Sequence, residues 1–160
     1  MSLVGRRVAV RVPATTANLG PGFDTLGLAL SLYDELVVEA TDVPGVRVTV
    51  EGVGAGEVPT DETNLVASSL LHALAAADVA APGLEIHARN AIPHGRGLGS
   101  SGAAVVAGIV AAKGLLAETA PLDDETLLRL ATEIEGHPDN VAPALFGGLA
   151  IAWTTLDGPA

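Results

Sequence analysis

The side chains of this sequence that could do chemistry gather in three segments. The first is a glycine-rich run, IPHGRGLGSSGAAVVAG, that covers residues 92–108. Its alternating glycines let the backbone approach a ligand with no Cβ in the way. A helix beginning near Ser100 would point unpaired N–H groups and the positive end of its dipole at the same space, and Ser100 and Ser101 add hydroxyls for a phosphate oxygen or a magnesium ion. The run suits phosphate binding, but a turn that uses glycines only for its geometry fits the same pattern.

Three better-known motifs are not met by this run. A P-loop needs a lysine here, and the only lysine of the chain is Lys113. The dinucleotide fingerprint needs a glycine where Ser100 stands. The esterase elbow fails because Leu98 and Ala103 occupy the positions of its flanking glycines. Any phosphate bound in this run is therefore bound by backbone amides, a helix end, a metal ion, hydroxyls or arginine.

The second segment, EIEGHPDN over residues 133–140, joins a predicted helix end to the start of a new helix. A connection of this kind between two helices brings side chains together at one place. A carboxylate there, such as Glu135, could hold magnesium, which favours one or two carboxylates together with substrate phosphates. Asp139 could accept a hydroxyl proton, and His137 and Asn140 could bind a polar substrate. Capping of the helix ends is the alternative role for each of these residues.

The third segment, PATTANLGPGFD over residues 13–24, contains Asn18 and Asp24 among prolines and glycines. Asparagine and aspartate in such a setting are found in binding loops. They are found equally in turns closed by their own side-chain hydrogen bonds. The pattern leaves both interpretations open.

The composition limits the classes of protein to which this chain can belong. The 160 residues are 49% hydrophobic but only 2% aromatic, which predicts one domain with an aliphatic core. The net charge of −11 makes nucleic acid and anionic membrane surfaces poor partners. The absence of cysteine excludes disulfides and thiolate metal sites, and it fits a cytoplasmic protein.

Hydrophobic periodicity indicates the elements that must position these segments. Alternation at Val8, Val10 and Val12 predicts a first strand. We expect further strands over 26–32, 36–40, 46–50, 84–88 and 149–154, with loops over 13–24 and 52–63 and a polar turn at 34–35. We expect helices over 64–77 with Thr63 or Asp61 as its cap, over 100–116, from a cap at Asp123 to Gly136, and from Pro138 to Gly147. Strands followed by strand–helix alternation indicate an α+β or α/β class.

Taken together, the three segments resemble the GHMP kinase superfamily, and homoserine kinases most of all. The central signature P-x-x-x-G-L-G-S-S-[AG]-A is met by Pro93, Gly97, Leu98, Gly99, Ser100, Ser101, Gly102 and Ala103. The segments VRVPATTANLGPGFDTLGLAL and EGHPDNVAPALFGGLAIA are similar to homoserine kinases. The resemblance implies an α+β fold, ribosomal protein S5 domain 2-like, with a mixed sheet and helices on one face. It implies that residues 1–160 form an N-terminal ATP-binding domain and that the C-terminal domain of the family, whose members are about twice as long, is absent from this chain.

The resemblance also implies roles for single residues. The residues that it implies to contact ATP are Pro93, His94, Gly95, Arg96, Gly97, Leu98, Gly99, Ser100, Ser101, Gly102 and Ala103. Ser101 and Glu135 would hold Mg²⁺, with Glu135 counted among the catalytic groups. The residues matching the amino-acid substrate site are Asn18, Asp24, His137 and Asn140. Asp139 falls where mevalonate-type relatives place a catalytic aspartate.

The implied reaction transfers a phosphoryl group from ATP to the hydroxyl of L-homoserine, a small-molecule substrate on the route to threonine. A homodimer is compatible with the resemblance. Two departures from the family pattern stand out: Gly102 replaces the usual alanine, and the turn before His137 is shorter than in many relatives. The alternatives are a kinase of mevalonate-like substrates and a truncated nucleotide-binding domain that is inactive alone.

Overall fold

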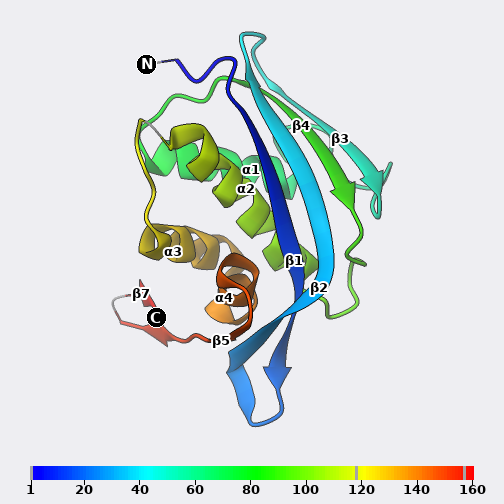
Figure 1. Cartoon of the computed structure of the whole chain (residues 1–160), viewed down its shortest axis with the longest axis vertical. Coiled ribbons are helices and arrows are strands. Elements are labelled where there is room, and N and C mark those ends of the chain that lie inside the picture. The colour runs from blue at the N-terminus through cyan, green and yellow to red at the C-terminus, as the bar shows by residue number, and fades with distance from the viewer. Residues whose placement is uncertain (1, 118, 157) are drawn as a thin grey trace.

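The protein is built from one mixed sheet with helices packed on one of its faces (Figure 1). The computed structural model describes residues 2–117, 119–156 and 158–160. The strands of the sheet are β1 (Arg7–Leu19), β2 (Gly22–Thr41), β3 (Val46–Gly52), β4 (Gly83–Asn90) and β5 (Leu149–Ile151). The order is β1-β2-β4-β3, with β5 paired to the distal part of β2. The β3–β4 pair is parallel, and the other pairs of this sheet among the described residues are antiparallel. A short ribbon of β6 (Thr154–Thr155) and β7 (Gly158–Pro159) follows.

In the described part of the chain, the second layer is formed by the helices α1 (Leu65–Ala76), α2 (Ser100–Leu116), α3 (Asp124–Glu135) and α4 (Pro138–Phe146). Their positions agree with the periodicity of the sequence. Asp123 caps α3 by accepting from the Thr126 amide at 2.8 Å, and Gly136 ends that helix in the left-handed conformation. The cap of α1 is Asn64 instead of the expected Thr63 or Asp61, because the Asn64 side chain accepts from the Val66 amide.

The core lies between the sheet and the helices and is aliphatic, as the composition predicts. Alternate residues of the strands are buried, among them Val38 and Ile86, and α2 is buried along most of its length. Small residues let α2 approach its neighbours: a Cβ on Gly108 would lie 2.3 Å from the carbonyl oxygen of Val66 in α1. Each fully buried leucine or isoleucine contributes about 2 kcal/mol of hydrophobic stabilisation. Within the described residues, no helix has the length and apolar character that crossing a membrane requires.

Two expectations about the strands are wrong. Residues 13–24 are not a loop, because β1 continues to Leu19 and pairs with β2 from Gly22, which makes a long hairpin. Nor is there a turn at Asp34 and Glu35, because β2 runs through both as one strand of 20 residues. The strand tolerates Asp34 on its buried side because backbone amides from another element bind its carboxylate. A register irregularity after Pro13 bends the distal hairpin toward α4 and β5.

Candidate active site

The glycine-rich segment forms the loop between β4 and α2, and its middle part is open to solvent. Residues 94–97 are exposed. Gly99 begins α2 in the left-handed conformation at φ 65°, and it provides no side chain to cap the first turn. The backbone amides of this turn therefore remain available to an anion. The helix start at Ser100 and the strand–loop–helix order agree with the sequence prediction.

The C-terminal end of this loop is attached to β1 through Thr15. The Thr15 amide donates to the carbonyl of Leu98 at 3.0 Å, and its hydroxyl donates to Oδ1 of Asn140 at 3.1 Å. A Cβ at Gly99 would lie 2.0 Å from the Thr15 hydroxyl oxygen, so only glycine fits there. Thr15 is fully buried and joins the loop, β1 and α4 at one point. Sequence reasoning missed this residue, since a threonine in a strand carries no signal of such contacts.

Ser101 and Glu135 meet beside the open helix start. The Ser101 hydroxyl donates to Oε2 of Glu135 at 2.9 Å, which joins the first turn of α2 to the last residue of α3. Among the described residues, no three His, Cys, Asp or Glu side chains cluster as a metal site would require. One carboxylate and one hydroxyl fit Mg²⁺, which keeps several water or phosphate oxygens in its coordination sphere. The two residues predicted to hold a metal ion therefore lie in contact, even though the turn before His137 is short.

Asp139 lies in the first turn of α4 and is 1% exposed. Its Oδ1 is hydrogen-bonded to Nδ1 of His137. Its Oδ2 is buried and has no hydrogen-bond partner in the structure. The first turn of α4 packs closely against β2, because a Cβ at Gly27 would lie 2.0 Å from the carbonyl oxygen of Asp139.

Asn18 and Asp24 lie together near the end of the hairpin. The Asp24 amide donates to Oδ1 of Asn18 at 2.9 Å, and both residues are exposed with positive φ angles of 55° and 59°. Ala17, the residue before Asn18, pairs with Gly27, which contacts Asp139. The hairpin therefore runs past the start of α4. In the part of the chain that the structure describes, no hydrogen bond joins Asn18 or Asp24 directly to His137 or Asn140.

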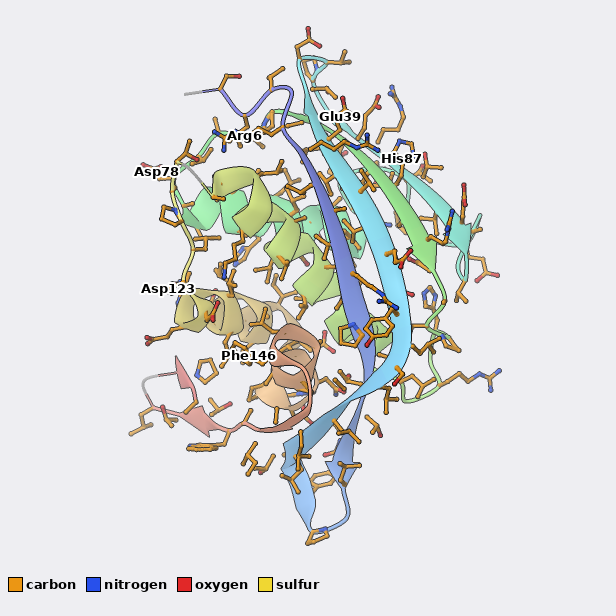
Figure 2. All side chains as sticks on the ribbon, in the orientation of Figure 1. Arg6, Glu39, Asp78, His87, Asp123 and Phe146 are labelled. Carbon is orange, nitrogen blue, oxygen red and sulfur yellow. The ribbon has the colours of Figure 1, made fainter. Side chains whose placement is uncertain are left out.

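A cavity of about 440 Å³ lies elsewhere, across strands β1, β2, β3 and β4. Its lining includes four residues that pair with one another across the four strands: Ala9, Val37, His87 and Thr49. Their side chains lie on the face of the sheet opposite to the buried one. Figure 2 shows His87 on the side away from the helices. This hollow contains none of the predicted site residues. The chemistry of the glycine loop, Ser101, Glu135 and Asp139 makes the helix side the better candidate.

Comparison with known proteins agrees with this architecture. A family model described as the GHMP kinases N terminal domain matches residues 64–148, which is more than half of the chain. The chain belongs to the GHMP kinases. The matched range contains the glycine loop, the Ser101–Glu135 pair and Asp139.

Among individual GHMP kinases, a homoserine kinase of Clavibacter michiganensis is 70% identical over 155 residues, 97% of this chain and 49% of that relative. The crystal structure of a homoserine kinase from Cytophaga hutchinsonii superposes with a TM-score of 0.80 at 38% identity, over 94% of this chain and 49% of that one. A mevalonate kinase of Methanococcus jannaschii shares the fold at a TM-score of 0.70 and 15% identity, over 98% of this chain and 56% of that one. This chain spans about half the length of the relatives it matches.

These findings confirm the resemblance to GHMP kinases and the α+β fold with a mixed sheet. They also confirm that homoserine kinases are among the similar proteins. They do not test the roles of single residues, which stay predictions supported by the geometry above.

Proposed function

We propose that this chain provides the ATP-binding part of a homoserine kinase, which converts ATP and L-homoserine into ADP and O-phospho-L-homoserine. The proposal is supported by the 70% identity to a protein named homoserine kinase. The structural observation that carries it is the Ser101–Glu135 pair beside the uncapped start of α2 and the exposed glycine loop. That combination supplies a binding surface for phosphates with a metal site at its edge.

Phosphate binding falls to the loop and the helix start. The residues concerned are the predicted set from Pro93 to Ala103. Amides in the first turn of α2 and the positive end of the helix stabilise negative charge, and they act in place of the lysine that a P-loop uses. The three glycines of the loop have positive φ angles, and the exposed backbone at Gly95 and Gly97 allows close approach. Gly102 is buried against Asn140, where a Cβ would lie 3.4 Å from the Asn140 Cβ.

Ser101 and Glu135 would hold Mg²⁺ through the hydroxyl and carboxylate oxygens. When bound, Mg²⁺ neutralises charge on the phosphate oxygens during transfer. The hydrogen bond between the two side chains keeps both oxygens at one point before any ligand binds. Such a preorganised pair lowers the reorganisation that the transfer step requires.

The amino-acid substrate is assigned to the hairpin and the start of α4. The carboxylate of Asp24 would pair with the substrate ammonium group, while Asn18, His137 and Asn140 orient the remainder. Oδ2 of Asp139 is the acceptor that we assign to the hydroxyl proton when the substrate oxygen bonds to the γ-phosphorus and the bond to ADP breaks. Holding the hydroxyl in line with the phosphoryl group supplies much of the acceleration.

Two other functions are kept as alternatives. A kinase of mevalonate-like substrates would share this fold, although the mevalonate kinase similarity stands at only 15% identity. The other alternative is a nucleotide-binding domain without activity of its own. A homodimer and a cytoplasmic location remain predictions.

A substrate panel tests the proposal. The protein is incubated with MgATP and either L-homoserine, L-serine or mevalonate, and products are identified by ³¹P NMR. Phosphorylation of L-homoserine alone is the expected result, and phosphorylation of mevalonate alone contradicts the proposal. Nucleotide binding by calorimetry without turnover of any substrate favours the inactive domain.

A further inference from the structure

A carboxyl group is buried in the middle of β2 at Asp34, which is only 8% exposed. Asp34 occupies the inward side of the strand, the same side as the buried Leu36 and Val38. Burial is the main effect on this group and raises the pKa of the Asp34 carboxyl, against the opposing effect of two backbone hydrogen bonds. A buried polar group is costly unless hydrogen bonds compensate it. The partners of Asp34 therefore indicate why an acid occupies this position.

Both partners are backbone amides of one short segment. Oδ1 of Asp34 accepts from the amide of Ala91 at 2.6 Å and from the amide of Ile92 at 2.9 Å. The last register pair between β2 and β4 is Glu35 with Arg89, so the chain leaves β2 just before these amides. Without Asp34, the two N–H groups would lose their partner at the end of the strand.

These amides lie at the entrance of the glycine-rich loop. Ile92 is fully buried, and Pro93 follows it with a restricted φ angle. The far end of the loop is attached separately, through the Thr15 amide and the Leu98 carbonyl. Only residues 94–97 lie exposed between the two attachments. The direction in which the chain enters the loop thus depends on a side chain 57 residues earlier in the sequence.

We propose that Asp34 is a positioning residue for phosphate binding, which fixes the entrance of the glycine-rich loop so that its amides face the nucleotide. The inference rests on the proposed function. Asp34 itself touches no phosphate in this scheme, and it acts through the amides of Ala91 and Ile92. A carboxylate suits the role better than a neutral side chain, because one charged oxygen serves two converging donors.

Two variants separate the hydrogen bonds from the packing. Asp34→Leu keeps a side chain of similar size but removes the acceptor, whereas Asp34→Asn keeps an oxygen acceptor. Glu35→Gln is the matched control, because Glu35 is the next residue and lies exposed on the opposite side of the strand, paired with Arg11. Hydrogen exchange of the Ala91 and Ile92 amides measures whether their hydrogen bonds to residue 34 are formed. Calorimetry with a non-hydrolysable ATP analogue and Mg²⁺ reports nucleotide binding.

We expect Asp34→Leu to accelerate exchange at both amides and to weaken nucleotide binding about tenfold, as the loss of a charge-assisted hydrogen bond implies. Asp34→Asn should restore most of the affinity, and Glu35→Gln should match the parent protein. In an active preparation, Asp34→Leu should raise the KM for ATP while the KM for L-homoserine stays constant. A general loss of folding would not produce that selective change.

The result that overturns the inference is faster exchange at Ala91 and Ile92 in Asp34→Leu with unchanged nucleotide affinity. If Asp34→Leu does not fold, Ala91→Pro removes the shorter hydrogen bond and leaves the carboxyl in place. It should weaken binding about threefold, and unchanged affinity would overturn the inference equally. Failure of the parent protein to bind the analogue would instead contradict the proposed function, and the inference would fall with it.

Discussion

The hydroxyl of Ser101 and the carboxylate of Glu135 are joined by a 2.9 Å hydrogen bond across the ends of two helices. The two residues are 34 positions apart, and each stands at a helix terminus: Ser101 in the first turn of α2 and Glu135 at the end of α3. The contact places both oxygens beside the open amides of α2. The proposed function uses this contact as a metal site that a phosphate would complete.

Removal of either oxygen from this pair should lower turnover strongly. We expect Ser101→Ala and Glu135→Ala each to reduce kcat by about 100-fold, a loss typical of one group that stabilises transition-state charge. The measurement is the initial rate as a function of Mg²⁺ concentration in an active preparation. Both variants should require more Mg²⁺ for half-maximal rate.

Ser68→Ala is a matched control for the serine variant. Ser68 lies near the start of α1, and its hydroxyl donates to the backbone carbonyl of Leu65. Its rate and Mg²⁺ dependence should equal those of the parent protein. Unchanged Mg²⁺ dependence in both Ser101→Ala and Glu135→Ala would contradict the metal assignment.

Replacement of Asp139 separates chemistry from stability. Asp139→Asn removes the carboxyl whose Oδ2 is buried without a partner, so we expect kcat to fall by about 100-fold or more with little change in the KM for ATP. Asparagine keeps an oxygen next to His137, so the melting temperature should change by no more than a few degrees. A large decrease in melting temperature with normal kcat would show that Asp139 is structural.

The two glycines on either side of Leu98 should differ in their tolerance of a side chain. Gly97→Ala meets no atom within 4 Å, so its cost is the left-handed backbone alone, about 1–2 kcal/mol. Gly99→Ala has the same backbone cost and also a contact of 2.0 Å with the Thr15 hydroxyl oxygen. Thermal unfolding should therefore show a larger decrease for Gly99→Ala, beyond the few degrees expected for Gly97→Ala. Equal decreases would contradict the packing described for Thr15.

The cap of α3 should make stability depend on pH in acid. The hydrogen bonds from the side chain and backbone of Thr126 hold the pKa of Asp123 below its ordinary value. A carboxyl whose pKa is lowered on folding stabilises the fold above its ordinary pKa, and this contribution is lost as the pH falls from that value through the lowered pKa of the folded state. Asp123→Asn keeps an acceptor but does not titrate, so urea unfolding should show a smaller loss of stability between about pH 5 and about pH 3.

Asp123→Ala completes that comparison. It removes the acceptor altogether, so its stability should already be lower at neutral pH. An acid loss in Asp123→Asn as large as in the parent protein would show that other carboxyl groups dominate the pH dependence.

The sequence predicted much of the fold because its signals are local. Alternating valines marked β1, Asp123 and Gly136 marked the ends of α3, and the glycine loop preceded a helix at Ser100. The continuity of β2 was missed because an acidic pair in a strand pattern is normally a turn. The buried carboxylate of Asp34 binds backbone amides that are distant in sequence, and the residue types do not reveal where such amides will lie.

The candidate site was predicted to a similar extent. The pair Ser101 and Glu135 came from the family pattern, and the structure brings the two residues together. Thr15 and Asp34 could not be found in the same way. Each acts on the glycine loop from a strand, and their contacts exist only after the hairpin, the loop and α4 have packed.

The long hairpin places two parts of the proposed site on one strand. Thr15 is attached to the exit of the glycine loop, and Asn18, three residues further along β1, lies in the region assigned to the amino acid. A substitution that changes the register of this hairpin should therefore disturb both regions together.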